Sequence, residues 1–330
     1  MGKALLDDWT VRPYQAGDET AIVDLFRRAF QKEPAPGYWS WKFKDNPVEI
    51  QAILAFDAAG NLAAHVGGMP VLTKVRDRVL PVSQGVDWMV DPAYRTGLRQ
   101  GRVITRITDL FFATYGNEAQ GALIFGIPIP SLRSILLAHG QEDFQPVSGL
   151  IRDLPGDPTP LEGSPRVQPV ALEDPQVGAV WEGLAPQFAM ATLRDRRHLT
   201  WRYGRCPVVT YQCLGVYDRL HRRLEGFAIL REEFPGWPFS VLVDWLAPRN
   251  RPEVGRELLA ACEAQAQAWG RSQLMTWFPP ESPEAREFIK AGYREMPTPY
   301  HLVGSLYTPL LTADWLRQHW YYTPGDTDAF

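Results

Sequence analysis

Residues 85–112 read GVDWMVDPAYRTGLRQGRVITRITDLFF. This pattern predicts a short apolar strand, an Asp-Pro turn, and a loop with arginines and glycines that opens directly into an amphipathic helix. The N-terminus of such a helix presents free backbone N–H groups and the positive end of the helix dipole, and both attract anions. The stretch therefore predicts a binding site for a phosphate-bearing cofactor.

The composition is that of an ordinary globular protein. The chain has 330 residues, which is room for two medium-sized domains. Its hydrophobic fraction is 45% and its charged fraction 22%. The net charge of −4 provides no general attraction to nucleic acid or to an anionic membrane surface. We therefore expect neither as a partner.

The cysteines and the apolar runs indicate where the protein resides. Cys206, Cys213 and Cys262 match no metal-binding or disulfide spacing, so we expect no metal site and a reducing compartment. No charged and apolar leader precedes the predicted fold, and no apolar run approaches the roughly 18 residues needed to span a bilayer. The sequence thus predicts a soluble protein of the cytoplasm.

The helix after the loop is predicted from about Leu98 to Tyr115. Its apolar residues recur at helical spacing and lie opposite Arg102, Arg106 and Asp109, so one face is expected to pack on a sheet. The residues of this apolar face are Val103, Ile104, Ile107, Leu110 and Phe111.

The second half of the chain repeats the first. Trp39-Ser40-Trp41-Lys42-Phe43 matches Leu199-Thr200-Trp201-Arg202-Tyr203, and Val86-Asp87-Trp88-Met89 matches Val243-Asp244-Trp245-Leu246. Two copies in the same order and at similar spacing imply duplicated domains of one architecture. The predicted order of elements in each copy is β-α-β-β-β-α-β-α-β.

This repeat defines the predicted domains. We expect an α/β fold with a mixed sheet in each half, the first domain at residues 1–153 and the second at residues 170–330, with the C-terminal tail. Between them, residues 154–169 are rich in proline and glycine and are predicted to form a linker.

The stretch Val90 to Gly101 resembles the acetyl-CoA loop of the GNAT superfamily of N-acetyltransferases. Phe125-Gly126-Ile127-Pro128 and the helix after it resemble the second motif of that family. The resemblance covers nearly the whole chain as a tandem pair of GNAT-like acyl-CoA N-acyltransferase domains. It implies an enzyme that moves an acetyl group from acetyl-CoA to a primary amine of a small molecule or peptide by direct attack, and it is compatible with a homodimer.

The resemblance also implies a set of cofactor contacts. Loop amides between Arg95 and Gly101 would cradle the pyrophosphate while arginines neutralise its charge. The main chain of Met89 and Val90 would pair with the pantetheine arm and direct one N–H at the thioester carbonyl. The predicted cofactor-binding residues are Met89, Val90, Arg95, Thr96, Gly97, Leu98, Arg99, Gln100, Gly101 and Arg102.

Two residues are candidates for proton transfer. An alkylammonium group must lose its proton before it can attack the thioester, which requires a base. Asp87 on the strand is the first candidate, and His139 near the end of the second-motif helix is a candidate acid or base. The alternatives are a structural hydrogen bond shared by Asp87 and its counterpart Asp244, and a capping or surface role for His139.

The second copy lacks the features of an anion-binding loop. Residues 248–255 contain Pro252 and Glu253 where the first copy has glycine, and we expect this domain not to bind CoA. Two other functions stay open. A FemABX-like aminoacyl transferase shares the duplicated fold, and a non-catalytic acyl-CoA-binding protein would fit the loop between Arg95 and Gly97, which is one residue shorter than the family pattern.

Overall fold

The computed structural model describes residues 9–95, 98–155 and 166–328, with the side chains of residues 98–102 excepted. The chain forms two compact units. Unit 1 comprises Met1–Leu72, Leu80–Gly126 and Gly304–Pro309, and unit 2 comprises Thr73–Val79, Ile127–Val303 and Leu310–Phe330.

Unit 1 is built on a mixed sheet. Its strands follow the order β1-β2-β3-β4-β5, and the last residues of β13 lie next to β5. The pairs β1·β2 and β2·β3 are antiparallel, whereas β4 and β5 are parallel. The elements are β1 (Thr10–Pro13), α1 (Glu19–Phe30), the π-helix η1 (Ser40–Lys44), β2 (Gln51–Phe56), β3 (Leu62–Val75), β4 (Arg78–Val90), the short helix η2 (Pro92–Tyr94), α2 (Leu98–Tyr115) and β5 (Leu123–Gly126).

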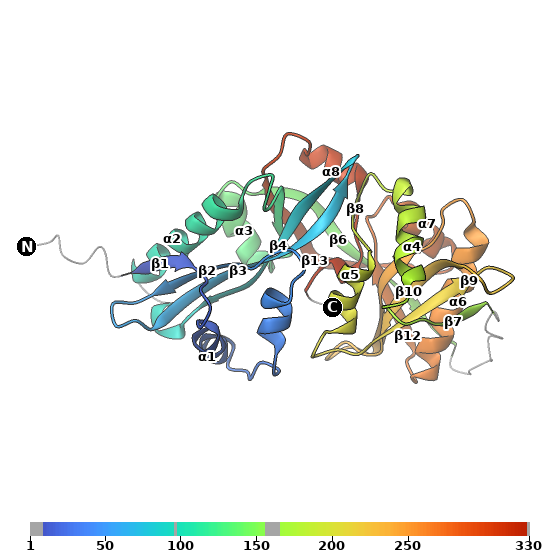
Figure 1. Ribbon diagram of the computed structural model, residues 1–330, viewed down its shortest axis with the longest axis horizontal. Coiled ribbons are helices and arrows are strands. Elements are labelled where there is room, and N and C mark those ends of the chain that lie inside the picture. Colours follow the sequence, from blue (N-terminus) through green and yellow to red (C-terminus); the bar gives the residue numbers. More distant parts are fainter. Residues whose placement is uncertain (1–8, 96–97, 156–165, 329–330) are drawn as a thin grey trace, which may run out of the picture. The chain divides into compact units, whose positions relative to one another are not determined.

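Helix α2 covers this sheet with the face that its periodicity predicts. Val103, Ile107 and Phe111 are four residues apart and completely buried, and Figure 1 shows α2 running along β1 and β2. Ile104 and Leu110 pack at the partly buried edge of the same cluster. Full burial of each such side chain stabilises the fold by about 1.5–3 kcal/mol. The predicted apolar face is confirmed.

Unit 2 repeats the arrangement, and its strands follow the order β13-β6-β12-β11-β10-β9-β7. Here β11 and β12 are the parallel pair, and both α4 and α6 pack on β10 (Figure 1). The elements are α3 (Pro130–Ala138), β6 (Glu142–Asp153), β7 (Val167–Pro169), α4 (Pro175–Leu184), η3 (Ala185–Gln187), β8 (Met190–Thr192), α5 (Arg196–Leu199), the π-helix η4 (Thr200–Gly204), β9 (Tyr211–Tyr217), β10 (Leu224–Arg231), β11 (Phe239–Leu246), α6 (Pro252–Ala268), β12 (Gln273–Trp277), α7 (Pro283–Lys290), β13 (Arg294–Leu306), α8 (Ala313–His319), β14 (Trp320–Tyr321) and η5 (Pro324–Asp326).

The compact units divide the chain at other points than the predicted ranges 1–153, 154–169 and 170–330. Strand β6 pairs antiparallel with β12 and therefore packs with unit 2. Val167–Pro169, expected within the linker, form β7 and pair with β9. Residues 156–165 of the predicted linker lie outside the described residues. The predicted ranges remain a prediction about the sequence repeat, while the units describe the packing.

Three further properties concern the described part of the chain. Each helix there is too short or too polar to cross a bilayer. Its His, Cys, Asp and Glu side chains form no group of three or more that could hold a metal ion. The thiols of Cys206, Cys213 and Cys262 are free.

A close backbone approach in unit 1 gives a first prediction. A Cβ atom on Gly304 would lie 2.2 Å from the carbonyl oxygen of Ile124, whereas a Cβ atom on Gly126 would meet open space. We expect Gly304→Ala to lower the free energy of unfolding by about 1–3 kcal/mol, because two backbones must move apart. Gly126→Ala is the matched control and should change stability by less than about 0.5 kcal/mol. Urea unfolding measures both, and equal stabilities would contradict the prediction.

Candidate functional site

Strand β4 extends well beyond its parallel neighbour. The two strands pair through Val82–Gln84 and Leu123–Phe125. Strand β5 then ends at Gly126, whereas β4 continues to Val90. The edge of β4 that faces β5 therefore has no β5 partner from Gly85 onward, and its backbone groups can pair with an extended ligand as a further strand would.

The middle of this open edge is kinked at Asp87. Asp87 has φ of 51°, a left-handed conformation that L-residues rarely adopt within a strand. Its carbonyl oxygen lies 2.7 Å from Nδ1 of His65 on β3. Since a carbonyl can only accept, Nδ1 of His65 carries the proton and donates it. This bond holds the backbone of Asp87 from the β3 side.

The Asp87 side chain is held by a buried lysine. Lys42 Nζ lies 3.1 Å and 3.2 Å from the two carboxylate oxygens of Asp87. The Lys42 side chain is 0% exposed and that of Asp87 is 12% exposed. The ammonium group also lies 4.8 Å from the ring centroid of Tyr38. The site thus combines a completely buried cation with a carboxylate that solvent can still reach.

Helix η1 brings Lys42 to this place. Phe43, the next residue, is buried against β3, where a Cβ atom on Gly67 would lie 2.7 Å from its ring. Phe43 also meets the His65 ring edge-on, with centroids 5.5 Å apart. Gly67 therefore permits the close packing of η1 on β3 that directs Lys42 toward Asp87.

His65 is neutral in this environment. Burial lowers its pKa. The hydrogen bond to the Asp87 carbonyl and the Asp87 charge oppose this shift, and the Lys42 cation adds a smaller effect in the same direction as burial. With Nδ1 protonated, Nε2 is an acceptor; it is buried and has no hydrogen-bond partner among the described residues. His65 therefore acts as a hydrogen-bond donor to β4 without adding charge.

The loop after β4 is tied to unit 1 by its own side chains. Asp91 accepts a hydrogen bond from the backbone N–H of Ala93 and forms an ion pair of 2.6 Å with Arg28. The Arg95 guanidinium donates to the carbonyl of Val90 at 2.9 Å and to that of Ala29. Arg95 therefore stabilises the end of β4 in the structure, and its contact with phosphate stays a prediction.

The other predicted cofactor residues are placed as follows. The Met89 side chain is buried, so its contribution to a ligand on the free edge would come from the backbone. Thr96 and Gly97 lie outside the described residues. Leu98, Arg99, Gln100, Gly101 and Arg102 form the first residues of α2, and their side chains also lie outside the description.

His139 lies at the C-terminus of α3 in unit 2, and its side chain is exposed. Its backbone N–H donates to the carbonyls of Ile135 and Leu136. Asp87 belongs to unit 1. A joint catalytic role for Asp87 and His139 stays a prediction.

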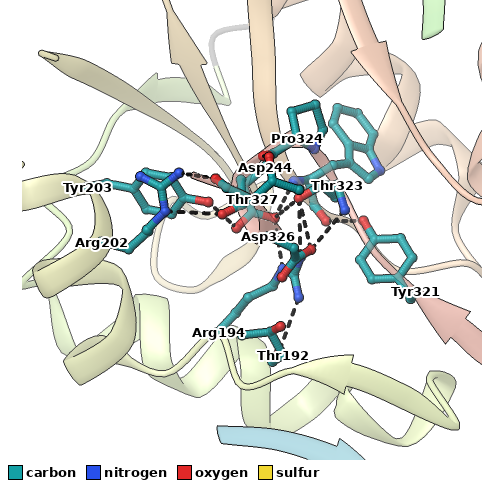
Figure 2. A network of polar contacts seen from close by, with 12 residues as sticks. Thr192, Arg194, Arg202, Tyr203, Asp244, Tyr321, Thr323, Pro324, Asp326 and Thr327 are labelled. Carbon is teal, nitrogen blue, oxygen red and sulfur yellow. Dashed lines mark hydrogen bonds and ion pairs between the residues drawn. The ribbon is translucent and has the colours of Figure 1, made fainter. Parts of the chain in front are cut away.

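Unit 2 contains the counterpart of Asp87, and there the carboxylate is completely enclosed. Asp244 accepts from Arg194 Nε at 2.8 Å and from the Tyr203 hydroxyl at 2.9 Å (Figure 2). Burial and the Asp244 carboxylate raise the pKa of Tyr203, which therefore stays protonated and donates. Arg194 also pairs with Asp326 of the tail at 2.7 Å.

The tail segment Thr323–Thr327 covers this part of β11. Arg202, the counterpart of Lys42, donates to the carbonyls of Gly325 at 3.1 Å and Thr327 at 2.7 Å (Figure 2). A Cβ atom on Gly325 would lie 1.9 Å from the Tyr203 hydroxyl and 2.7 Å from the carbonyl oxygen of Val243. The tail backbone thus lies directly against the strand, where unit 1 leaves Asp87 accessible.

Unit 2 also has a cavity of about 220 Å³ between the end of β11, the start of α6 and α7. Its wall is mainly apolar and includes Trp245, Leu259 and Phe288. Arg249 on its rim is neutralised by Glu284, with N–O distances of 2.8 Å and 3.0 Å. The start of α6 contributes Pro252, which has no N–H, and Arg256 to the wall. The expectation that this domain does not bind CoA stays a prediction.

The family of acetyltransferase (GNAT) domains matches residues 10–133, which include η1, β4 and the loop into α2. The chain therefore contains a GNAT domain at residues 10–133. It is an acyltransferase, as the resemblance implied, and its fold class of two tandem GNAT-like units is confirmed. No curated protein matches the sequence.

Solved structures share the GNAT fold along most of the chain. A protein of unknown function from Enterococcus faecalis V583, described as a probable N-acyltransferase, gives a TM-score of 0.63 at 15% identity, over 91% of this chain and 73% of that chain. Saccharomyces cerevisiae N-myristoyltransferase with bound myristoyl-CoA gives a TM-score of 0.61 at 11% identity, over 92% and 83%. At these identities the likeness shows the fold alone.

The sequence predicted Asp87 as a site residue, and this stays a prediction; it did not single out Lys42 or His65, which contact Asp87 in the structure. A signal for Lys42 existed, since both copies of the aromatic repeat carry a cation at this position, Lys42 and Arg202. A charged residue between aromatic residues can be buried or exposed, and the sequence alone does not distinguish these two positions. His65 stands alone in an Ala-rich strand, and its role depends on the pairing of β3 with β4.

Unit 2 gives a prediction of pH dependence. Burial lowers the pKa of His198 to about 3; Asp326 opposes this shift, and the cations Arg194 and Arg202 reinforce it. Because the unfolded histidine titrates near pH ~6.5, the unfolded chain binds more protons below that pH. The contribution of neutral His198 to stability is therefore complete above about pH 6.5 and is lost as the pH falls toward 3.

His198→Phe, which keeps an aromatic ring beside Trp201, removes this titration. Between about pH 7.5 and 5.5 the wild-type protein should lose about 1.4 kcal/mol more stability than the variant. Urea unfolding at the two pH values measures the difference. An unchanged pH dependence in the variant would contradict the assignment.

Proposed function

We propose that the protein is a cytoplasmic N-acetyltransferase in which unit 1 binds acetyl-CoA and transfers its acetyl group to a primary amine of a small molecule or peptide. The observation that carries this proposal is the free edge of β4 from Gly85 to Val90, with the accessible carboxylate of Asp87 at its middle. The GNAT match over the same residues supports it.

In this proposal the cofactor lies along β4 and the N-terminus of α2. The backbone groups of Met89 and Val90 pair with the amide groups of the pantetheine arm, and one N–H donates to the thioester oxygen. The pyrophosphate lies at the loop from Arg95 to Arg102, where backbone N–H groups and the helix dipole favour an anion. Unit 2, with Pro252 and Glu253 at the corresponding helix, does not bind CoA.

The chemistry requires one proton acceptor. The Asp87 carboxylate takes a proton from the acceptor ammonium, and the free amine attacks the thioester carbonyl carbon. The C–S bond breaks as the new C–N bond forms. The nitrogen loses its second proton to solvent, and the CoA thiolate takes up one proton. The net change converts an ammonium and acetyl-CoA into an amide, CoA thiol and one proton.

A longer acyl group is the second candidate. The yeast N-myristoyltransferase structure with the same fold holds myristoyl-CoA. Thiol release from a series of acyl-CoA esters, from acetyl to myristoyl, with a panel of primary amines separates the two. Highest kcat/KM with acetyl-CoA supports the proposal, and highest kcat/KM with a long chain supports the second candidate. Binding without turnover would indicate an acyl-CoA-binding protein, and no binding would contradict both.

The cofactor loop gives a specific prediction. Gly97→Glu places a carboxylate where the pyrophosphate is proposed to bind, and it should weaken acetyl-CoA binding at least tenfold, to about the detection limit of calorimetry. Gly183→Glu is the matched control, because Gly183 lies exposed on α4 with no atom near its Cβ position. Equal affinities in the two variants would contradict the placement of the cofactor.

The proposed base, Asp87, gives a further prediction. Asp87→Asn preserves size, tolerates the left-handed φ and keeps an oxygen that can accept from Lys42, so acetyl-CoA should still bind. It removes the proton acceptor, so kcat should fall about a hundredfold. Asp45→Asn, at an exposed aspartate beside η1, is the control and should keep wild-type kcat. Rates are normalised to folded protein by circular dichroism. Wild-type kcat in Asp87→Asn would rule out the base role.

A further inference from the structure

The buried ammonium of Lys42 is not explained by packing. Its side chain is 0% exposed, and a buried charge costs several kcal/mol that its partner must offset. An apolar side chain of similar length would fill the same space without that cost. The position of the charge, 3.1 Å from the carboxylate of Asp87, therefore points to a role that depends on Asp87.

Asp87 itself occupies an unfavourable conformation. A left-handed φ of 51° is unfavourable for a residue with a Cβ atom relative to an ordinary strand conformation. Two bonds act on it from two sides. Lys42 holds the carboxylate, and Nδ1 of His65 donates to the carbonyl oxygen at 2.7 Å. Together they fix both the side chain and the peptide group that follows it.

The kink lies immediately before the residues proposed to bind the cofactor. A change of φ at Asp87 rotates every following peptide of β4, including those of Met89 and Val90. A strand that relaxed to ordinary φ values would direct different N–H and C=O groups at the free edge, since successive residues of a strand face opposite sides.

We propose that Lys42 is a positioning residue, an inference that rests on the proposed function. The ion pair of Lys42 with Asp87 and the hydrogen bond from His65 to the Asp87 carbonyl together hold β4 in its kinked conformation. This conformation presents the free edge of β4 to the acyl-CoA. Lys42 is covered by protein and acts through Asp87. Loss of the Lys42 ammonium therefore changes the geometry of the free edge of β4.

The test uses glycine as a substitute for the ion pair. Glycine adopts φ near +50° without a Cβ penalty, so it can keep the kink in the absence of Lys42. We compare Lys42→Met, Lys42→Arg, Lys42→Met/Asp87→Gly and Lys42→Met/Asp87→Ala. Lys44→Met is the control, since Lys44 belongs to the same π-helix but forms an exposed ion pair with Glu19.

The first readout is CoA binding by calorimetry, which needs no turnover. Lys42→Met should weaken binding about tenfold or more, and Lys42→Arg should recover most of the loss. The double variant with glycine should bind within about threefold of wild type, whereas the one with alanine should stay weak. Wild-type affinity in Lys42→Met, or equal affinities in the two double variants, would overturn the proposal.

Two further measurements separate this inference from the proposed function. The double variant with glycine should bind CoA yet lose turnover, because it lacks the Asp87 carboxylate; if it also turns over, the base role fails and the positioning role stands. If the wild-type protein binds no CoA, the proposed function fails. Hydrogen exchange of those amides of residues 86–90 that face β3 then decides the positioning role, which requires slow exchange in wild type and the glycine variant and fast exchange in Lys42→Met and the alanine variant.

Discussion

The parallel pairing of β4 with β5 stops after three residues, and the candidate site of unit 1 depends on this limit. A longer parallel ladder would satisfy the backbone of β4 with protein groups and leave nothing for a ligand. Because β5 ends at Gly126, the residues from Gly85 to Val90 keep one edge open. The kink at Asp87, the packing of η1 and the helix α2 all act on this edge.

The two units stabilise the equivalent aspartate in different ways. In unit 1 a single lysine neutralises Asp87 and leaves it 12% exposed. In unit 2, Asp244 is surrounded by Arg194, Tyr203 and the tail segment Thr323–Thr327, and its side chain is 2% exposed. The same strand position thus serves a buried polar network in one unit and an accessible site in the other.

Local sequence patterns predicted the helices and strands well. They did not predict contacts between residues that lie far apart in the sequence. The period of apolar residues predicted α2 with the observed bounds, and the aromatic repeat predicted equivalent segments that both form π-helices, η1 and η4. Strand β6 follows unit 1 elements in sequence but pairs with β12, more than a hundred residues later, which no local pattern indicates. Lys42 was missed for the same reason, because its partner lies 45 positions away.

The tail network also affects the order in which unit 2 can form during synthesis. Arg194 and Arg202 are almost completely buried, and their partners Asp326 and Thr327 follow 132 and 125 positions later in the chain. At ribosomal rates of about 5–20 residues per second, this separation corresponds to a delay on the order of 10 s. During that time the guanidinium groups of Arg194 and Arg202, which are buried in the finished fold, lack their carboxylate and carbonyl partners from the tail. The core of unit 2 beside β11 therefore closes late, after the strands around it have been made.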